Sequence, residues 1–233
     1  MERVQAIRTI LYKDIWDLRW NGQVILLLLC QIVIHIGLYI LDIHTVLPAL
    51  FVGFIVTLLT MYMQGNLIVE ESEQGTLKLL HQMKVHPVDI FIAKSLLTLV
   101  VSIIVFFISA IFYGYTLLSI FIGILFILPL FLMFLFFGTI LGIISKNTID
   151  VSLYGWAVVL LYFVFEGIVS YNTSSHPGIL LVLPNYHLFH GLQMIEQQDF
   201  ISAFSQYFYV PVGWAVLTMI ITSRITREFR KPI

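Results

Sequence analysis

Acidic residues are concentrated in one short stretch of a chain that is otherwise poor in charge. Of the 233 residues, 60% are hydrophobic and 11% are charged, yet Glu70, Glu71 and Glu73 fall within four positions. The stretch continues as "EESEQGTLKLLHQMKVHP". A dense polar segment in so apolar a chain is expected to lie outside the membrane, where it contacts either a partner protein or the membrane surface.

The residues after these acids predict a short helix. Gly75 provides a break and Thr76 a possible N-cap, while Leu77 and Leu80 share one apolar face and Pro87 ends the segment. An apolar face on a helix outside the bilayer has to be buried. The residues alone leave two alternatives open, a soluble partner protein or the inner surface of the membrane.

Other polar residues with possible chemistry lie within apolar segments. Glu166 is a candidate functional residue because an ionisable group inside a membrane span costs free energy. The alternative is that it has no such function and its carboxylate reaches the outer membrane interface. His187 and His190 share a helical face, but no acid or cysteine is placed to complete a metal site. The chain has no His-Glu-x-x-His, no Gly-x-Ser-x-Gly and no pair of intramembrane acids, so a membrane-embedded enzyme is not predicted.

The elements that position these residues are predicted to be membrane-spanning helices. A span needs about 20 mostly apolar residues, and six segments meet this requirement. The predicted fold is an all-α integral membrane protein, with an interfacial helix in residues 1–22 followed by a single six-span domain in residues 23–233. The predicted spans are Gln23–Leu41, Leu47–Val69, Ile90–Tyr113, Leu117–Ile144, Val151–Tyr171 and Tyr209–Ser223.

The basic residues predict how the spans are oriented. With six spans, all 12 lysines and arginines fall at the termini, between or just within the second and third spans, or between the fourth and fifth. Because lysine and arginine are retained on the cytoplasmic side, both termini and the loop of residues 70–89 are predicted to be cytoplasmic.

Two further segments are predicted to lie along the membrane surface or partly within it. The N-terminal segment is amphipathic, with an apolar face predicted from Val4, Ile7, Leu11, Ile15 and Leu18. The long outer loop, residues 172–208, contains apolar runs too short to span, which predicts re-entrant or interfacial helices between the fifth and sixth spans. In the fourth predicted span, a Gly-x-x-x-Gly pattern (residues 138–142) predicts close packing against another helix of the same chain.

The segment "EESEQGTLKLLHQMKVHPVDIFIAKSL" resembles the first cytosolic loop of type-2 ABC transporter permeases. In that family an acid-rich segment leads to Gly-Thr, a leucine stripe, a proline and a lysine that enters the next span. The family often has an arginine between its acids, where this chain has Ser72. The order of the predicted elements also matches the family. The matching positions are Glu71, Glu73, Gly75, Thr76, Leu77, Leu80, Pro87 and Lys94.

The resemblance implies a mechanism and a set of partners. The helix around Thr76–Met83 would be a coupling helix that docks on a dimer of ATP-binding subunits, whose closure switches the spans between inward and outward access. The chain lacks a Gly-x-x-x-x-Gly-Lys-Ser/Thr loop, so ATP and Mg²⁺ would be bound by the partner and no cofactor by this chain. The other expected partners are a second permease, identical or homologous, and the lipid bilayer of a bacterial plasma membrane. No nucleic acid is expected as a partner.

The predicted substrate path is nearly uncharged and includes Phe54, Thr57, Tyr162 and Glu166. Such a path favours export of a hydrophobic or amphipathic cargo. Compact permeases of the family resemble exporters of bacteriocins, toxins and amphipathic peptides, including phenol-soluble modulins, with a role in self-immunity among the possibilities. Export of a lipid or a drug is the alternative within the family. From other classes, an ion-coupled secondary transporter using Glu166 and a membrane scaffold without transport also remain open.

Overall fold

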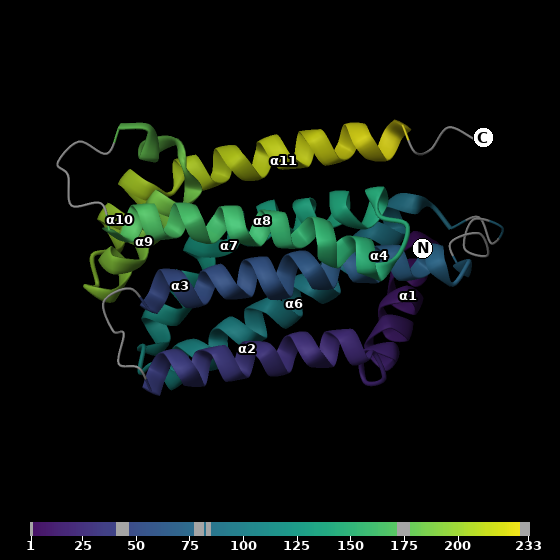
Figure 1. Cartoon of the computed structure of the whole chain (residues 1–233), viewed down its shortest axis with the longest axis horizontal. Helices are drawn as coiled ribbons and strands as arrows, with labels where there is room; N and C mark the ends of the chain where they lie inside the picture. The colour runs from purple at the N-terminus through teal and green to yellow at the C-terminus, as the bar shows by residue number, and fades with distance from the viewer. Residues whose placement is uncertain (1, 41–46, 77–81, 83–84, 172–177, 229–233) are drawn as a thin grey trace.

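The computed structural model describes residues 2–40, 47–76, 82, 85–171 and 178–228, and every regular element in these ranges is a helix. The all-α prediction is therefore confirmed for the described residues. The long helices lie roughly side by side along the long axis of the molecule, as Figure 1 shows. Both α1 and the last turns of α11 lie at one end of this bundle, and α9 and α10 lie at the other.

The helices follow one another along the chain with short connections. They are α1 (Glu2–Leu18), α2 (Gly22–Ile40), α3 (Leu47–Phe54), the π-helical segment η1 (Ile55–Met61), α4 (Tyr62–Glu73), α6 (Pro87–Phe112), α7 (Leu117–Ile144), α8 (Thr148–Tyr171), the 3₁₀ segment η2 (Gly178–Val182), α9 (Pro184–Glu196), α10 (Phe200–Tyr207) and α11 (Tyr209–Glu228).

Five single helices are long and apolar enough to cross a membrane, and α1 with α2 forms a pair, bent by 68°, that meets the same criteria as a sixth. The prediction of six spans agrees with the upper of these two counts. The large apolar side chains on the outside of the described helices lie along these spans, as expected where lipid replaces water. The five helices are Ala49–Glu73, Val88–Phe112, Leu117–Ile144, Thr148–Tyr171 and Tyr209–Thr226.

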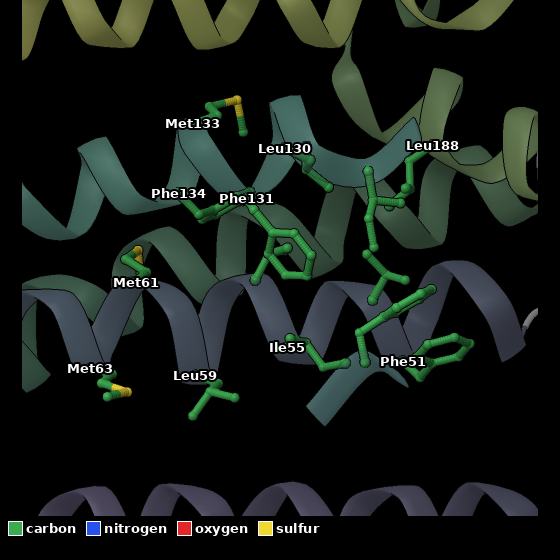
Figure 2. Packing of buried hydrophobic residues seen from close by; sticks show 14 of the residues in the cluster. Phe51, Ile55, Leu59, Met61, Met63, Leu130, Phe131, Met133, Phe134 and Leu188 are labelled. Carbon is green, nitrogen blue, oxygen red and sulfur yellow. The ribbon is translucent and has the colours of Figure 1, made fainter. Parts of the chain in front are cut away.

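The second span is the central helix of the bundle. It runs through α3, η1 and α4, and 83% of its most apolar window is buried. Figure 2 shows Phe51, Ile55 and Met61 from this span beside Phe131 and Phe134 of α7. All five side chains are less than 5% exposed. A span enclosed by its neighbours on all sides can be moved only if those neighbours move or separate.

The glycines of the fourth span allow α7 to lie directly against α4, as the sequence predicted. A Cβ atom on Gly138 would lie 2.3 Å from the carbonyl oxygen of Met61, and one on Gly142 would lie 2.7 Å from that of Gly65. Real Cβ atoms do not approach other atoms this closely, so only glycine permits this separation of the two backbones. The Gly-x-x-x-Gly pattern therefore serves packing within the chain.

Short helices connect α8 to α11 at the end of the bundle opposite α1 (Figure 1). Leu188 and Leu192 of α9 are buried in the main hydrophobic core. The indole nitrogen of Trp214, on α11, donates a hydrogen bond of 2.8 Å to the carbonyl oxygen of Val182 in η2. The short helices expected in this region are therefore present, and their placement relative to the membrane remains a prediction.

Candidate functional site

The acids that opened the sequence analysis belong to a helix. The α4 helix continues to Glu73, four residues beyond the predicted end of the span at Val69, so Glu70 and Glu71 lie in its last turn. The chain turns after Gln74 at Gly75, whose φ of 69° is a conformation that glycine adopts without steric strain. Glu71 is buried and Glu73 is exposed, so these two carboxylates have different surroundings.

The residues predicted to couple this chain to an ATPase are described only in part. The Thr76 hydroxyl donates to the carboxylate of Glu71, and Pro87 is the first residue of α6. Leu77 and Leu80 lie outside the described residues. The role of this segment in coupling therefore remains a prediction.

Glu71 joins three helices through opposite charges. Its Oε1 accepts a hydrogen bond of 2.8 Å from Lys13 Nζ of α1 and one of 2.9 Å from Lys94 Nζ of α6. Lys94 Nζ also donates to Oδ2 of Asp14 at 3.1 Å. The side chains of Asp14, Glu71 and Lys94 are 2–4% exposed. Burial of these charges is offset because each has an opposite charge within hydrogen-bond distance. We call Lys13, Asp14, Glu71 and Lys94 the α1 charge cluster.

Two further polar contacts hold α1 and the start of α2 to the same helices. Arg3 forms an ion pair of 2.8 Å with Asp89 in the first turn of α6. The Asn21 amide donates to Oε1 of Glu70, on α4, at 2.7 Å. An apolar contact lies between them, where Ile10 packs with residues at the start of α6. The helix α1 is therefore attached both to the last turns of α4 and to the first turns of α6.

The prediction of an apolar face on α1 is confirmed for Ile7, Leu11 and Leu18, which are partly buried against the core, but the most buried positions are others. Ile10 is 5% exposed and Asp14 is 3% exposed, whereas Val4 and Ile15 of the predicted face are 72% and 45% exposed. The buried positions are four residues apart and therefore share one side of the helix. The sequence analysis missed Asp14. The signal that could have identified it was Lys94, a lysine within an apolar span that needs a buried carboxylate partner.

An open pocket of about 680 Å³ lies beside the α1 charge cluster, in the bend between α1 and α2. Leu67 and Thr148 contribute to its lining, which brings α4 and the start of α8 to the same place. The charged residues of the lining are five acids and two lysines, namely Asp14, Asp17, Glu70, Glu71, Glu73, Lys13 and Lys94.

The residues of the predicted substrate path lie inside the bundle or at its edge. The Thr57 hydroxyl donates to the carbonyl oxygen of Gly53 at 2.7 Å, which satisfies it within its own helix. The Phe54 and Phe163 ring centroids are 4.4 Å apart, and those of Tyr162 and Phe134 are 5.4 Å apart. In this conformation these side chains pack against their neighbours, and whether they line a path when the bundle opens remains a prediction.

Glu166 is fully buried, at 0% exposure, so its carboxyl group does not reach an exposed interface. Its Oε2 accepts a hydrogen bond of 2.8 Å from the side-chain amide of Asn185, the second residue of α9. Its Oε1 has no hydrogen-bond partner among the described residues. The sequence analysis missed Asn185, whose only signal was a polar residue directly after a proline in an otherwise apolar segment.

A third polar group lies within the bundle and is fully hydrogen-bonded. The Gln64 amide nitrogen donates to the hydroxyls of Ser95 and Thr139, at 3.2 and 3.1 Å, and its oxygen accepts from Thr98 at 2.9 Å. These contacts join α4 to both α6 and α7. Such a network in an apolar region favours one arrangement of the three helices.

The comparison with protein families agrees with this architecture of apolar helices. Residues 6–196 match the model of the family described as ABC-2 type transporter, which covers α1 to α9. No curated protein matches the chain. The match extends over far more than half of the 233 residues. The chain therefore belongs to the ABC-2 family and is the membrane component of an ABC transporter.

Proposed function

We propose that this chain is the permease subunit of an ATP-driven exporter, with amphipathic peptides, toxins or bacteriocins as its cargo. The observation that carries the proposal is the attachment of α1, α4 and α6 to one another through Glu71 and Lys94. Along the chain, Glu71 precedes and Lys94 follows residues 76–83, where the ATPase subunit is expected to dock.

The mechanism follows from how the docking segment is attached. An ATPase that pushes on residues 76–83 acts on the last turns of α4 and the first turns of α6. The α1 charge cluster makes these turns and α1 move together, because separating them would leave charges buried without partners. The α4 movement then reaches α7 through the close contact at Gly138 and Gly142. A rigid-body shift of this kind can switch access from one side of the membrane to the other.

The distribution of buried charge supports a hydrophobic or amphipathic cargo. Among the described residues, the buried lysine and three of the buried acids lie near α1, and Glu166 is the fourth buried acid. The predicted path between these regions consists of aromatic, aliphatic and hydroxyl side chains. Glu166 is the single ionisable acid of this predicted path, so a highly charged cargo would find few charged side chains to replace its water.

The complete transporter is proposed to contain two permeases and two ATPase subunits in the plasma membrane, with both termini in the cytoplasm. Lys13, Lys94, Lys146 and Arg224 all lie near the end of the bundle that carries α1, which agrees with the orientation predicted from basic residues. ATP and Mg²⁺ would be bound by the partner subunits.

Mild extraction of the tagged protein tests the ATPase partner. We expect a soluble subunit with a Gly-x-x-x-x-Gly-Lys-Ser/Thr loop to co-purify, and to be lost in Leu80→Asp and reduced in Glu73→Lys. Glu73 is chosen because its side chain is exposed, whereas reversal of Glu71 would break the α1 charge cluster. The matched control is Lys146→Asp, an exposed charge change between α7 and α8. Equal recovery of the ATPase with all three variants would contradict the proposed docking segment.

Sensitivity of cells to added compounds tests the cargo. Deletion of the protein is expected to increase sensitivity to amphipathic helical peptides, and expression of the wild type but not Leu80→Asp is expected to restore resistance. A panel of hydrophobic drugs is the comparison. Increased sensitivity to the drugs alone would reject peptides in favour of the alternative cargo.

A further inference from the structure

Glu166 is a buried acid without a positive partner. Among the described residues, the one hydrogen bond to its carboxyl group comes from the neutral amide of Asn185. The nearest basic residue along the chain before it is Lys146, 20 positions earlier, and this separation corresponds to about 30 Å along a helix. The other lysines and arginines that the structure describes lie in or directly after α1, near the start of α6 and near the end of α11.

An ionised carboxylate in this position would be costly. Taking a charge out of water costs several kcal/mol even after the protein relaxes, and one neutral donor offsets only part of that. A buried acid that lacks a cation instead takes up a proton, which removes the charge. Because Glu166 Oε1 is buried with no acceptor or donor among the described residues, it is free to carry that proton.

We propose that Glu166 is a proton-binding site that is occupied in this conformation and holds α9 against α8. The contact is made on the α9 side by Asn185, whose amide nitrogen lies 2.8 Å from Glu166 Oε2 and 3.4 Å from the carbonyl oxygen of Tyr162. Loss of the proton leaves a carboxylate that is stable only in water. Separation of α9 from α8 would supply that water, so proton release and separation of the two helices favour each other.

A line of polar groups leads from Glu166 to the nearest end of the bundle. Tyr162, Glu166 and Ser170 are spaced four residues apart and therefore share one side of α8. Each has a buried oxygen atom with no hydrogen-bond partner among the described residues. Ser170 is the penultimate residue of α8, at the end opposite α1. Water that enters at this end would meet Ser170 first and Glu166 next, which provides a path for the proton, and Tyr162 lies one turn further inside.

The elements around Glu166 contain few other groups that could exchange a proton with it. The α8 helix provides Tyr162, and the sequences of α3, η1, η2 and α7 contain no titratable side chain. The α4 helix contributes Tyr62, whose hydroxyl donates to the carbonyl oxygen of Ser152, 14 positions before Glu166 on α8. On α9, the titratable residues that follow Asn185 directly are Tyr186 and His187. The Nε2 atom of His187 lies within hydrogen-bond distance, 2.8 Å, of the carbonyl oxygen of Leu181. Among the described residues of α3, η1, η2, α7, α8 and α9, Glu166 is therefore the buried carboxyl group, and it has no cation beside it.

Infrared spectroscopy of the full-length protein in lipid nanodiscs tests the proton directly. We expect a carboxylic C=O stretching band at neutral pH that disappears in Glu166→Gln and persists in Glu196→Gln, an exposed acid at the end of α9. Asn185→Leu keeps the carboxyl group but removes its donor, so its band should remain and shift to higher frequency. Absence of the band in the wild type, or its persistence unchanged in Glu166→Gln, would overturn the proposal.

Thermal stability provides a second readout. The folded protein binds a proton at Glu166 that the unfolded chain releases above about pH 4, so stability is expected to fall as pH rises from about 5 to 9. We expect the unfolding temperature of the wild type to fall by several degrees more over this interval than that of Glu166→Gln. An equal pH dependence of both proteins would count against the site.

These measurements need no ATPase and no cargo. Their failure would remove the proton site and leave the proposed exporter function untouched, whereas failure of the ATPase to co-purify would leave the infrared result unchanged. The consequence for transport, that opening of the bundle at α9 releases a proton, rests on the proposed function.

Discussion

The two ends of the bundle contain buried acids in opposite circumstances. Near α1, the Glu71 carboxylate accepts hydrogen bonds from Lys13, Lys94 and Thr76, and Asp14 shares Lys94 with it. At the other end, Glu166 has one neutral donor and one oxygen without a partner.

The difference indicates which contacts persist during transport. A carboxylate with several opposite charges loses a large free energy when its partners leave, so α1, α4 and α6 are expected to remain together. A carboxyl group with a single neutral donor loses little when that donor leaves, provided that water replaces it. The bundle is therefore expected to move as a unit near α1 and to open near α9.

The largest expected effect is that of Lys94→Met. The methionine fills a similar volume but leaves Asp14 and Glu71 buried, with Lys13 as the one cation near them among the described residues. Breaking such a buried ion group costs about 3–5 kcal/mol. We expect little folded protein after extraction and a much lower unfolding temperature. Lys146→Met, which removes an exposed lysine, is the control and should behave as the wild type.

A rescue experiment separates lost charge balance from lost packing at Lys94. In the triple variant Lys94→Met, Glu71→Gln and Asp14→Asn, no buried charge is left without a partner. We expect it to recover part of the stability, because replacing a whole buried ion group is less harmful than breaking it. If Lys94→Met alone kept the wild-type unfolding temperature, the α1 charge cluster would not be what holds α1 in place.

The same substitution at the two ends gives the most direct comparison. Glu71→Gln removes the charge from a carboxylate bound to two lysines, and we expect it to lower stability by about 2 kcal/mol. Glu166→Gln replaces a protonated acid with a neutral side chain of the same shape. We expect its stability to equal that of the wild type near pH 5 and to exceed it at neutral pH, because only the unfolded wild type gains free energy by releasing the proton. The unfolding temperatures of the two variants, measured under the same conditions, test this comparison. An equal decrease in both variants would mean that the two buried acids do not differ in this way.

Much of the fold could be predicted from composition and periodicity. Long apolar segments bounded by turns correspond to α2, α7, α8 and α11, because a membrane helix satisfies its own backbone and requires only length and hydrophobicity. The close contact of α4 with α7 followed from Gly138 and Gly142, since paired small residues have one main use within a span.

The candidate sites could be predicted less well because they depend on contacts between distant residues. The acids after Val69 indicated a loop, but Lys13 and Lys94 neutralise Glu71 and allow the helix to continue to Glu73. A contact between residues 166 and 185 leaves no periodic signal in either segment. Local patterns identified Glu71 and Glu166 as unusual, and only the tertiary contacts distinguish a paired charge from an unpaired one.

The smallest expected effect is that of Lys13→Ala. This variant tests whether the α1 charge cluster is stabilised by the exposed ion pair of Lys13 or by the buried ion pairs of Lys94. The Lys13 side chain is 44% exposed, so its ion pair with Glu71 is screened by solvent and worth about 1 kcal/mol or less. Glu71 keeps Lys94 at 2.9 Å, and no charge is left buried without a partner. We expect a slightly lower unfolding temperature, and added salt should reduce the difference from the wild type. If Lys13→Ala lowered the unfolding temperature as much as Lys94→Met, the exposed ion pair between Lys13 and Glu71 would be what holds α1 to α4. Burial of Lys94 would then not be the main source of stability in the α1 charge cluster.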